Sequence, residues 1–351
     1  MSAPNANRTP PAQSRRWQWA TVVALLFVGL VAAAVIVPRR ERPDVATPVP
    51  GAAAGRGIVG VFVEPEDGRG PILDEIEAAR DEITLAIYLI SDNEIIDALG
   101  AAAARGVHVR VLLEEHPFGG GGGQPETFER LAAAGIDIRW SNPAFRFSHV
   151  KTFTMDRQVA VIMNQNLTWS SFEQNRELGV VTTRPRDVAE ALALFEADWE
   201  RAAEPPAEAL VVSPTNSRVV LLDLIASARR SLDVYAEVIR DEEFVDALAA
   251  AARRGVDVRI VMSKGDERQS ATLRDLADAG VGVRLVSDIY IHAKLFLADG
   301  DRAYVGSQNM TATSLDQNRE IGIVIDDPAG VARIARAFAT DWRIGKELPP
   351  P

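Results

Sequence analysis

From about residue 57 onward, short apolar runs alternate with stretches in which apolar residues recur every three or four positions. The short runs predict strands and the periodic stretches predict helices. In the first half we expect, in order, a strand at 58–63, a helix at 72–80, a strand at 83–90, a helix at 94–105 and a strand at 107–113. Strands that are apolar on both faces, alternating with helices, indicate an α/β fold whose sheet is covered on both sides.

The second half of the chain repeats this order, with a helix at 219–229, a strand at 232–238 and a helix at 243–254. Ala103–Arg110 also matches Ala252–Arg259 in sequence, with a glycine after the helix in both copies. Only two such units exist, which indicates a duplication and not a solenoid. We therefore predict two repeats, 57–205 and 206–351. Five consecutive glycines at 119–123 predict a flexible loop in the first repeat.

The N-terminal segment has a different composition. Residues 1–16 are rich in Pro, Asn and Arg and predict a disordered basic tail. Ala20 to Val37 are 18 uncharged residues, about 27 Å of helix, which is long enough to cross a bilayer. We predict a transmembrane signal anchor at 17–38 and a Pro/Ala linker at 39–56. A cleaved signal peptide is the alternative, and Pro38-Arg39-Arg40 is unfavourable for cleavage.

The net charge of the chain indicates which class of partner it can bind. The formal net charge is −11, and since residues 1–44 carry +4, the remainder carries −15. A strongly acidic body is unfavourable for non-specific binding of nucleic acid. The chain has no cysteine, which excludes disulfides and thiolate metal sites.

One motif occurs twice. His149-x-Lys151-x4-Asp156 is repeated as His292-x-Lys294-x4-Asp299, with an offset of 143 residues. In both copies an asparagine, Asn166 or Asn309, follows the histidine by 17 residues, and a Gln-Asn-Arg-Glu run follows further on. The chain has only four His and four Lys, and two of each fall in these motifs. A repeat at fixed offset is therefore poorly explained by chance.

An imidazole two residues from an ammonium suits chemistry on phosphate. On a strand, residues i and i+2 project from the same face, so we expect each His and Lys to point the same way. One histidine could attack phosphorus while the other protonates the leaving alcohol and then activates water. Two lysines, asparagine amides and a serine hydroxyl could stabilise the developing charge. We therefore expect no metal or other cofactor.

These residues resemble the phospholipase D superfamily, whose signature is H-x-K-x4-D with a trailing G-S-x-N, usually in two copies. The second copy fits fully, with Gly306-Ser307 before Asn309, whereas the first has Met163-Asn164 in place of Gly-Ser. The resemblance implies two α/β/α-sandwich lobes packed about a pseudo-twofold axis, with one active site between them. It implies catalytic roles for the six motif residues His149, Lys151, Asp156, His292, Lys294 and Asp299, and phosphate contacts from Asn166, Ser307 and Asn309.

Some residues of the pattern have alternative interpretations. Asp156 and Asp299 each stand where a strand is followed by a turn, and this position favours a structural hairpin role over the catalytic one. Glu177 and Glu320, in the Gln-Asn-Arg-Glu runs, are candidates to orient a histidine through its second nitrogen. The neighbouring Arg176 and Arg319 are more consistent with structural ion pairs. The resemblance indicates the first-copy histidine as nucleophile, although the residues alone do not rank the two.

The function that we expect is a phospholipase D-type phosphodiesterase, which hydrolyses or transfers the phosphatidyl group of a membrane phospholipid through a phosphohistidine. A membrane-anchored nuclease of the same superfamily and a cardiolipin-synthase-like transferase are the alternatives; a degenerate, inactive scaffold is least consistent with the intact His and Lys pairs. We expect a monomer, because one chain holds both motifs. We also expect a single-pass membrane location with the catalytic domain on the extracytoplasmic side.

Overall fold

The computed structural model describes residues 57–119, 123–264 and 269–348. The predicted basic tail (1–16), transmembrane anchor (17–38) and linker (39–56) lie outside these ranges, as does the centre of the glycine run. Within the described residues, none of the helices is both long and apolar enough to span a membrane.

The first lobe is built on an eight-stranded mixed sheet with the order β1-β7-β6-β5-β2-β3-β4, and β12 pairs with β7. Strands β2, β3 and β4 are parallel to one another, and the neighbours on the other side of β2 are antiparallel. The strands are β1 (Ile58–Glu64), β2 (Glu82–Ile87), β3 (His108–Leu113), β4 (Asp137–Trp140), β5 (Lys151–Met155), β6 (Val159–Met163) and β7 (Asn175–Thr182). The helices are α2 (Gly70–Ala78), α3 (Asn93–Ala104), α4 (Gln124–Ala133), α5 (Trp169–Glu173) and α6 (Pro185–Glu200).

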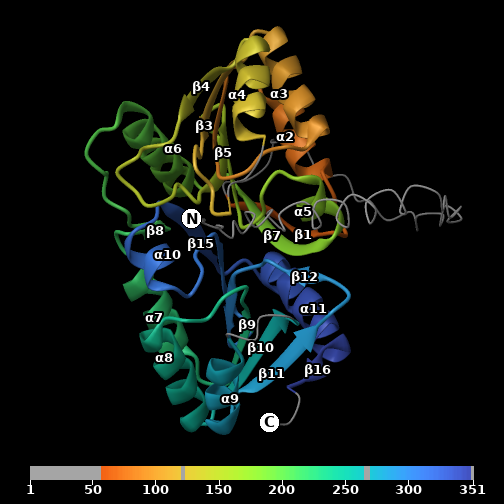
Figure 1. Cartoon of the computed structure of the whole chain (residues 1–351), viewed down its shortest axis with the longest axis vertical. Helices are drawn as coiled ribbons and strands as arrows, with labels where there is room; N and C mark the ends of the chain where they lie inside the picture. The colour runs from red at the N-terminus through yellow and green to blue at the C-terminus, as the bar shows by residue number, and fades with distance from the viewer. Residues whose placement is uncertain (1–56, 120–122, 265–268, 349–351) are drawn as a thin grey trace, which may run out of the picture. The chain divides into compact units, whose positions relative to one another are not determined.

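The second lobe repeats this plan with the sheet order β16-β11-β10-β9-β13-β14-β15-β8. Its strands are β8 (Leu210–Ser213), β9 (Ser231–Tyr235), β10 (Asp257–Ser263), β11 (Gly282–Val286), β13 (Leu295–Ala298), β14 (Arg302–Gly306), β15 (Glu320–Ile325) and β16 (Lys346–Glu347), and the short β12 is Tyr290–Ile291. Its helices are α7 (Ser217–Ser227), α8 (Glu242–Arg253), α9 (Ser270–Asp278), α10 (Ala312–Asp316) and α11 (Pro328–Ile344). Figure 1 shows the two lobes in orange to green and in teal to blue.

Local sequence explains the element ends. Helix α3 begins after Asp92, whose carboxylate accepts hydrogen bonds from the amides of Glu94 and Ile95. It ends before Gly106, which has a φ of 91°, a conformation that a side chain would strain. Gly255 has a φ of 89° at the matching place after α8. The sequence-based strands and helices agree with these elements to within a few residues at each end.

The alternation of side chains along the strands assigns each sheet face to a different layer. In the first lobe, Leu85 belongs to the apolar cluster that also holds buried residues of α2 and α3, and its neighbour Ala86 belongs to the cluster that includes α6. The cluster with α6 continues into the second lobe, where it takes in Ile334 and Phe338 of α11. One hydrophobic core is therefore shared by both lobes, with α6 and α11 in its central layer, and this core holds the two halves of the site in register.

Candidate active site

The two H-x-K pairs lie where strands begin, and not inside strands as the sequence pattern indicated. His149 precedes β5, and Lys151 is the first residue of that strand. His292 and Lys294 both lie between β12 and β13. In each copy the lysine Nζ donates a hydrogen bond to the carbonyl oxygen of its own histidine, at 2.8 Å for Lys151 and 2.7 Å for Lys294. The pair is thus a compact unit at one end of a strand.

Each H-x-K segment pairs through its backbone with the other lobe. The amide of His149 donates to the carbonyl of Arg319 at 2.8 Å, beside a bridge between Ser148 and Arg319. In the equivalent arrangement of the other copy, β12 runs parallel to β7, and the amide of Ala293 donates to the carbonyl of Arg176 at 2.9 Å. Each histidine therefore lies next to the glutamate that follows the arginine of the opposite repeat.

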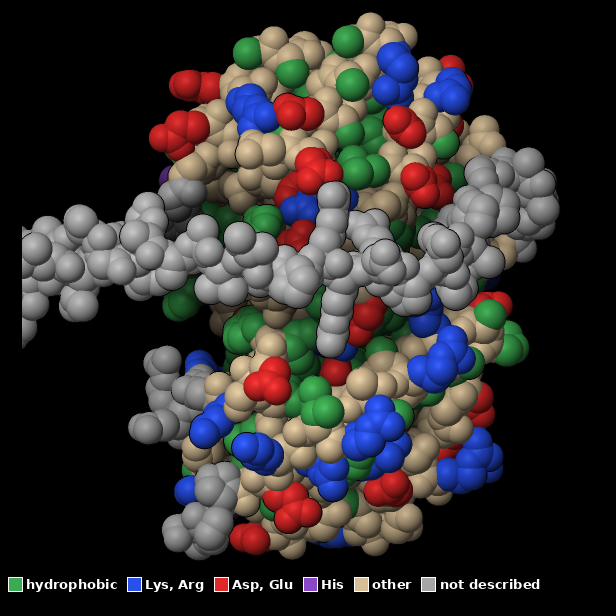
Figure 2. All heavy atoms as spheres, turned by 90° about the vertical axis from the view of Figure 1, so that its right-hand side faces the viewer, with side chains coloured by type: hydrophobic (Ala, Val, Ile, Leu, Met, Phe, Trp, Pro, Cys, Tyr) green, Lys and Arg blue, Asp and Glu red, His purple; other side chains and the backbone are tan. Residues whose placement is uncertain are grey.

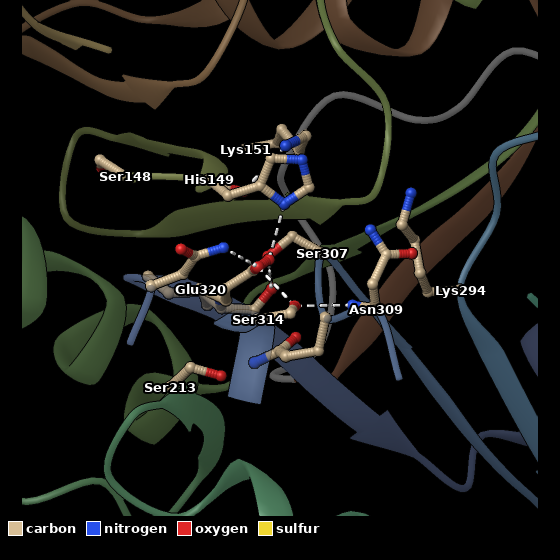
Figure 3. A network of polar contacts seen from close by, with 12 residues as sticks. Ser148, His149, Lys151, Ser213, Lys294, Ser307, Asn309, Ser314 and Glu320 are labelled. Atoms are coloured by element: carbon tan, nitrogen blue, oxygen red, sulfur yellow. Dashed lines mark hydrogen bonds and ion pairs between the residues drawn. The ribbon is translucent and has the colours of Figure 1, made fainter. Parts of the chain in front are cut away.

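The histidines and glutamates are paired across the lobes. His149 Nδ1 lies 2.8 Å from Glu320 Oε2, and His292 Nδ1 lies 2.8 Å from Glu177 Oε2. Figure 3 shows the His149 ring directed at Glu320, with Ser314 below and Asn309 and Lys294 beside them. Both carboxylates are fully buried. A carboxylate at Nδ1 fixes the ring orientation and leaves Nε2 for chemistry.

The rest of the Gln-Asn-Arg-Glu run supports these glutamates. Asn318 Nδ2 and Ser314 Oγ donate to Glu320 Oε1 at 2.9 and 2.6 Å. Asn175 Nδ2 donates in the same way to Glu177 Oε1 at 3.1 Å. Both oxygens of each carboxylate are therefore occupied, and neither side chain is free to rotate.

The arginines of the same runs join the lobes. Arg176 of the first lobe contacts both carboxylate oxygens of Asp341 on α11, at 2.6 and 3.1 Å. Arg319 of the second lobe contacts both oxygens of Asp198 on α6, at 2.9 and 3.1 Å. The prediction that these arginines make structural ion pairs is confirmed.

The electrostatics of the first half-site favour a neutral His149. Burial and, to a smaller extent, the charge of Lys151 lower the pKa of His149 to about 4, against the opposing effect of Glu320. Burial also lowers the pKa of Lys151 well below its usual range. Burial opposes ionisation of Glu320, but the contacts with His149 and Lys151 outweigh it and lower the pKa of that carboxyl. At neutral pH, His149 is an uncharged imidazole beside an ionised carboxylate.

The hydroxyl of Ser307 is hydrogen-bonded to the backbone of Ile321, which argues against the phosphate contact that the sequence indicated. This buried hydroxyl donates to the carbonyl of Ile321 and accepts from the amide of the same residue, at 3.3 and 3.2 Å. In the first repeat, Asn164 Oδ1 accepts from the amide of Leu178 at 2.8 Å. The asparagine thus makes the matching contact to β7, and the departure from Gly-Ser leaves the first half-site intact.

The glycine before Ser307 has its own physical reason. A Cβ at Gly306 would collide with the buried Tyr304 hydroxyl and with Gly322 on β15. In the first repeat, the residue at the Tyr304 position is Val161, which is smaller, and Met163 occupies the Gly306 position. The two copies fill the same space with different side chains.

Asp156 and Asp299 are not site residues, so their inclusion in the catalytic set was wrong and the hairpin alternative holds. Each follows its strand at the end away from the motif lysine and has a positive φ, 50° and 54° respectively. The carboxylate of Asp156 accepts from the amides of residues 80, 81 and 82 at 2.8–3.0 Å. Asp299 does the same for residues 229–231 at 2.6–3.1 Å. They close the turns that precede β2 and β9.

Asn166 and Asn309 follow β6 and β14, and Figure 3 shows Asn309 beside Lys294. Asn309 Nδ2 donates to Glu237 Oε2 at 3.3 Å. The Oδ1 atoms of Asn166 and Asn309 are buried without a hydrogen-bond partner among the described residues. An amide Oδ1 accepts hydrogen bonds, as a phosphate oxygen does, so the atoms of these asparagines that could contact a phosphate oxygen are the Nδ2 donors.

Glu237 is the site residue that sequence reasoning missed. Its Oε2 accepts from Lys294 Nζ at 2.8 Å and lies 3.6 Å from His292 Nε2. Burial opposes its ionisation, but Lys294 and His292 still lower the pKa of Glu237. No sequence signal indicated it, because Glu237 lies outside both motifs and the matching position of the first repeat, when Ile83–Ile90 is aligned with Leu232–Ile239, is Tyr88.

Tyr88 gives the first half-site a different lining. Its ring packs edge-on against His149, with 4.6 Å between ring centroids, and lies 4.8 Å from Lys151 Nζ. Its hydroxyl accepts from the amide of Phe118 at 2.5 Å, and burial raises its pKa to about 12, so it stays protonated.

No group of His, Asp and Glu side chains in the described ranges is arranged to hold a metal ion.

Comparison with known proteins places the chain in a family. The family model described as "Cardiolipin synthase, PLD-like domain" matches twice, at residues 72–199 and 221–342. The chain belongs to this phospholipase D-like family. Cardiolipin synthase of Staphylococcus aureus is 25% identical over 338 residues, which cover 82% of this chain and 68% of that protein. Cardiolipin synthase A of Proteus mirabilis is 27% identical over 365 residues, covering 86% of this chain and 72% of that protein.

Two solved structures share the fold. Phosphatidylserine synthase of Haemophilus influenzae superimposes with a TM-score of 0.64 at 12% identity, over 82% of this chain and 87% of the synthase. Polyphosphate kinase of Porphyromonas gingivalis has a TM-score of 0.64 at 20% identity, over 81% of this chain but 47% of the kinase. The chain therefore shares its two-lobed α/β fold with both structures, and the family model identifies the two repeats as phospholipase D-like, as predicted.

Proposed function

We propose that this protein is a phospholipase D-type phosphatidyltransferase that moves the phosphatidyl group of a membrane phospholipid to an alcohol through a phosphohistidine. The observation that carries the proposal is the crossed pairing of His149 with Glu320 and of His292 with Glu177. It gives two oriented imidazoles, each beside a lysine. The similarity to cardiolipin synthases supports an alcohol as acceptor and a lipid as donor; with water as acceptor, the same steps give hydrolysis.

The geometry supports a division of labour between the histidines. Neutral His149 keeps its proton on Nδ1, from which it donates a hydrogen bond to Glu320, and presents the Nε2 lone pair to phosphorus. As the N–P bond forms, the P–O bond to the leaving alcohol breaks, and that oxygen takes a proton from His292 Nε2. His292 then removes the proton of the acceptor hydroxyl, whose oxygen attacks phosphorus and releases His149.

The two half-sites differ in the group that faces each histidine. The carboxylate of Glu237 lies 3.6 Å from His292 Nε2. His149 instead packs against the uncharged ring of Tyr88. The lysines and the amides of Asn166 and Asn309 would stabilise charge on the phosphoryl oxygens.

The surface fits a lipid donor better than a nucleic acid. In Figure 2, acidic side chains lie among the basic ones on the parts of both lobes that the view leaves uncovered. Such mixed charge would give little of the phosphate-backbone attraction on which nucleic-acid binding depends.

The test is product analysis with the full chain in detergent. Mixed micelles of phosphatidylglycerol and, in parallel, single-stranded DNA are incubated with and without EDTA. We expect release of glycerol and formation of diphosphatidylglycerol, unchanged by EDTA because lysines stabilise the charge. His149→Ala is the inactive control. His108→Ala is the matched histidine control, because His108 is exposed on β3 and contacts Asp137.

Two results would contradict the proposal. Degradation of DNA with no change in the lipid would make the protein a nuclease. Loss of lipid turnover in EDTA, restored by a divalent ion, would show that the charge-stabilising role given to Lys151 and Lys294 is wrong.

A further inference from the structure

Glu237 accepts hydrogen bonds from the donors that a phosphate oxygen would need. Its Oε2 accepts from Lys294 Nζ at 2.8 Å and from Asn309 Nδ2 at 3.3 Å. The same oxygen lies 3.6 Å from His292 Nε2. A carboxylate oxygen and a non-bridging phosphate oxygen are both anionic acceptors and take the same donors. In this structure the second half-site is therefore occupied by an anion of the protein itself.

The first half-site has no such occupant. Tyr88 stands at the position of Glu237, and none of the ion pairs between described residues includes Lys151. The ammonium of Lys151 contacts the carbonyl of His149 and the face of the Tyr88 ring. The two lysines are equivalent in sequence, but only Lys294 already has a carboxylate partner.

A carboxylate and a phosphate oxygen cannot occupy one position. Two like charges at van der Waals distance in a partly buried site repel strongly, because little water lies between them to screen the interaction. The Glu237 side chain can also leave this position. This side chain is 22% exposed, and its Oε1 accepts from the hydroxyl of Tyr290, a residue that is 47% exposed. Rotation toward this rim would free Lys294 and Asn309.

We propose that Glu237 is an internal competitor of the substrate phosphate, which must displace this carboxylate from Lys294 and Asn309 in order to bind. The inference rests on the proposed function, in which this site binds a phosphodiester. It makes Glu237 a specificity-determining residue. A small anion such as inorganic phosphate brings no other binding energy to offset the displacement, whereas a phospholipid brings contacts of its glycerol and acyl groups.

The test is the binding of inorganic phosphate to the full chain in detergent at pH 8, by isothermal titration calorimetry. Glu237→Gln keeps the shape of the side chain and removes its charge. We expect phosphate to bind at least about tenfold more tightly to this variant than to the wild type. Glu243→Gln is the matched control, because Glu243 is an exposed carboxylate that pairs with Arg218. It should bind phosphate as the wild type does.

A second variant and a second readout keep the inference falsifiable if Glu237→Gln is unstable. In Glu237→Ala, Lys294 loses its carboxylate partner, so phosphate should raise the melting temperature of this variant more than that of the wild type. Equal or weaker phosphate binding in both variants, or binding undetectable in every protein, would overturn the proposal. Because no turnover is measured, lipid that stays unreacted would count against the proposed function and not against this inference.

Discussion

The imidazole Nδ1 of His149 is hydrogen-bonded at 2.8 Å to Oε2 of Glu320, a carboxylate of the other repeat. His292 and Glu177 make the mirror contact at the same distance. An isolated repeat would contain a histidine, a lysine and a glutamate. The histidine that this glutamate orients, however, belongs to the other repeat. The site therefore depends on both copies.

We expect Glu320→Gln to lower kcat by about 10²–10⁴-fold with little change in KM, as loss of an orienting carboxylate does in other histidine-dependent sites. The amide keeps the volume of the side chain but not the charge that holds the Nδ1 proton. Lipid turnover under saturating substrate measures the effect. Glu196→Gln, which removes a carboxylate of α6 that pairs with Arg110 on β3, is the control. A loss of less than tenfold would show that the crossed contact is only structural.

The histidines should differ in the adduct that they leave. With a lipid phosphodiester whose leaving group is p-nitrophenol, the leaving oxygen needs no proton, so His292→Ala should still form the N–P bond at His149 and then stall. Mass spectrometry of the digested protein should find the phosphatidyl adduct on His149. His149→Ala should carry none. An adduct on His292 in that variant would reverse the two roles, and no adduct in either would argue against a covalent route.

Ser307→Ala should affect stability and not substrate binding. The hydroxyl bonds the backbone of Ile321, so its loss should cost about 1 kcal/mol of unfolding free energy. Urea denaturation measures this, and KM should stay within a few-fold of the wild type. Asn164→Ala, at the equivalent place in the first repeat, should behave similarly. A tenfold rise in KM at unchanged stability would return Ser307 to the phosphate site.

Glu64 should make stability depend on pH. It is fully buried on β1, its Oε2 accepts from the amide of Gly68 at 2.6 Å, and its Oε1 has no partner in the described part of the chain. Burial raises the pKa of Glu64 from 4.5 to about 9, helped by the negative charges of Asp67 and Glu177. Between these values the folded protein holds a proton that the unfolded chain releases, so stability falls as pH rises through this window.

The variant Glu64→Gln cannot ionise and should lose this pH dependence. In urea titrations, the difference in unfolding free energy between this variant and the wild type should increase steadily, in favour of the variant, between pH 5 and pH 9. Parallel curves for the two proteins would mean that Glu64 is ionised in the fold.

Local sequence determined much of the result. The apolar periods and the glycines after α3 and α8 depend on nearest neighbours along the chain, so they predicted the elements correctly. The motif spacing, repeated at an offset of 143 residues, located the histidines and lysines of the site. It also indicated that Glu177 and Glu320 serve histidines, because a carboxylate recurs at the same place in each repeat.

Only the tertiary structure decided which residues meet. Glu177 is equally placed in sequence to serve either histidine, and the backbone pairing of β12 with β7 assigns it to His292. The motif lists Ser307 with the phosphate contacts, but the register of β14 against β15 turns its hydroxyl to the backbone. Glu237 lies outside both motifs and reaches Lys294 because β9 and β13 are neighbours. Spacing along a chain specifies which groups are present, whereas their partners depend on long-range strand pairing, which a sequence of two near-equivalent repeats leaves ambiguous.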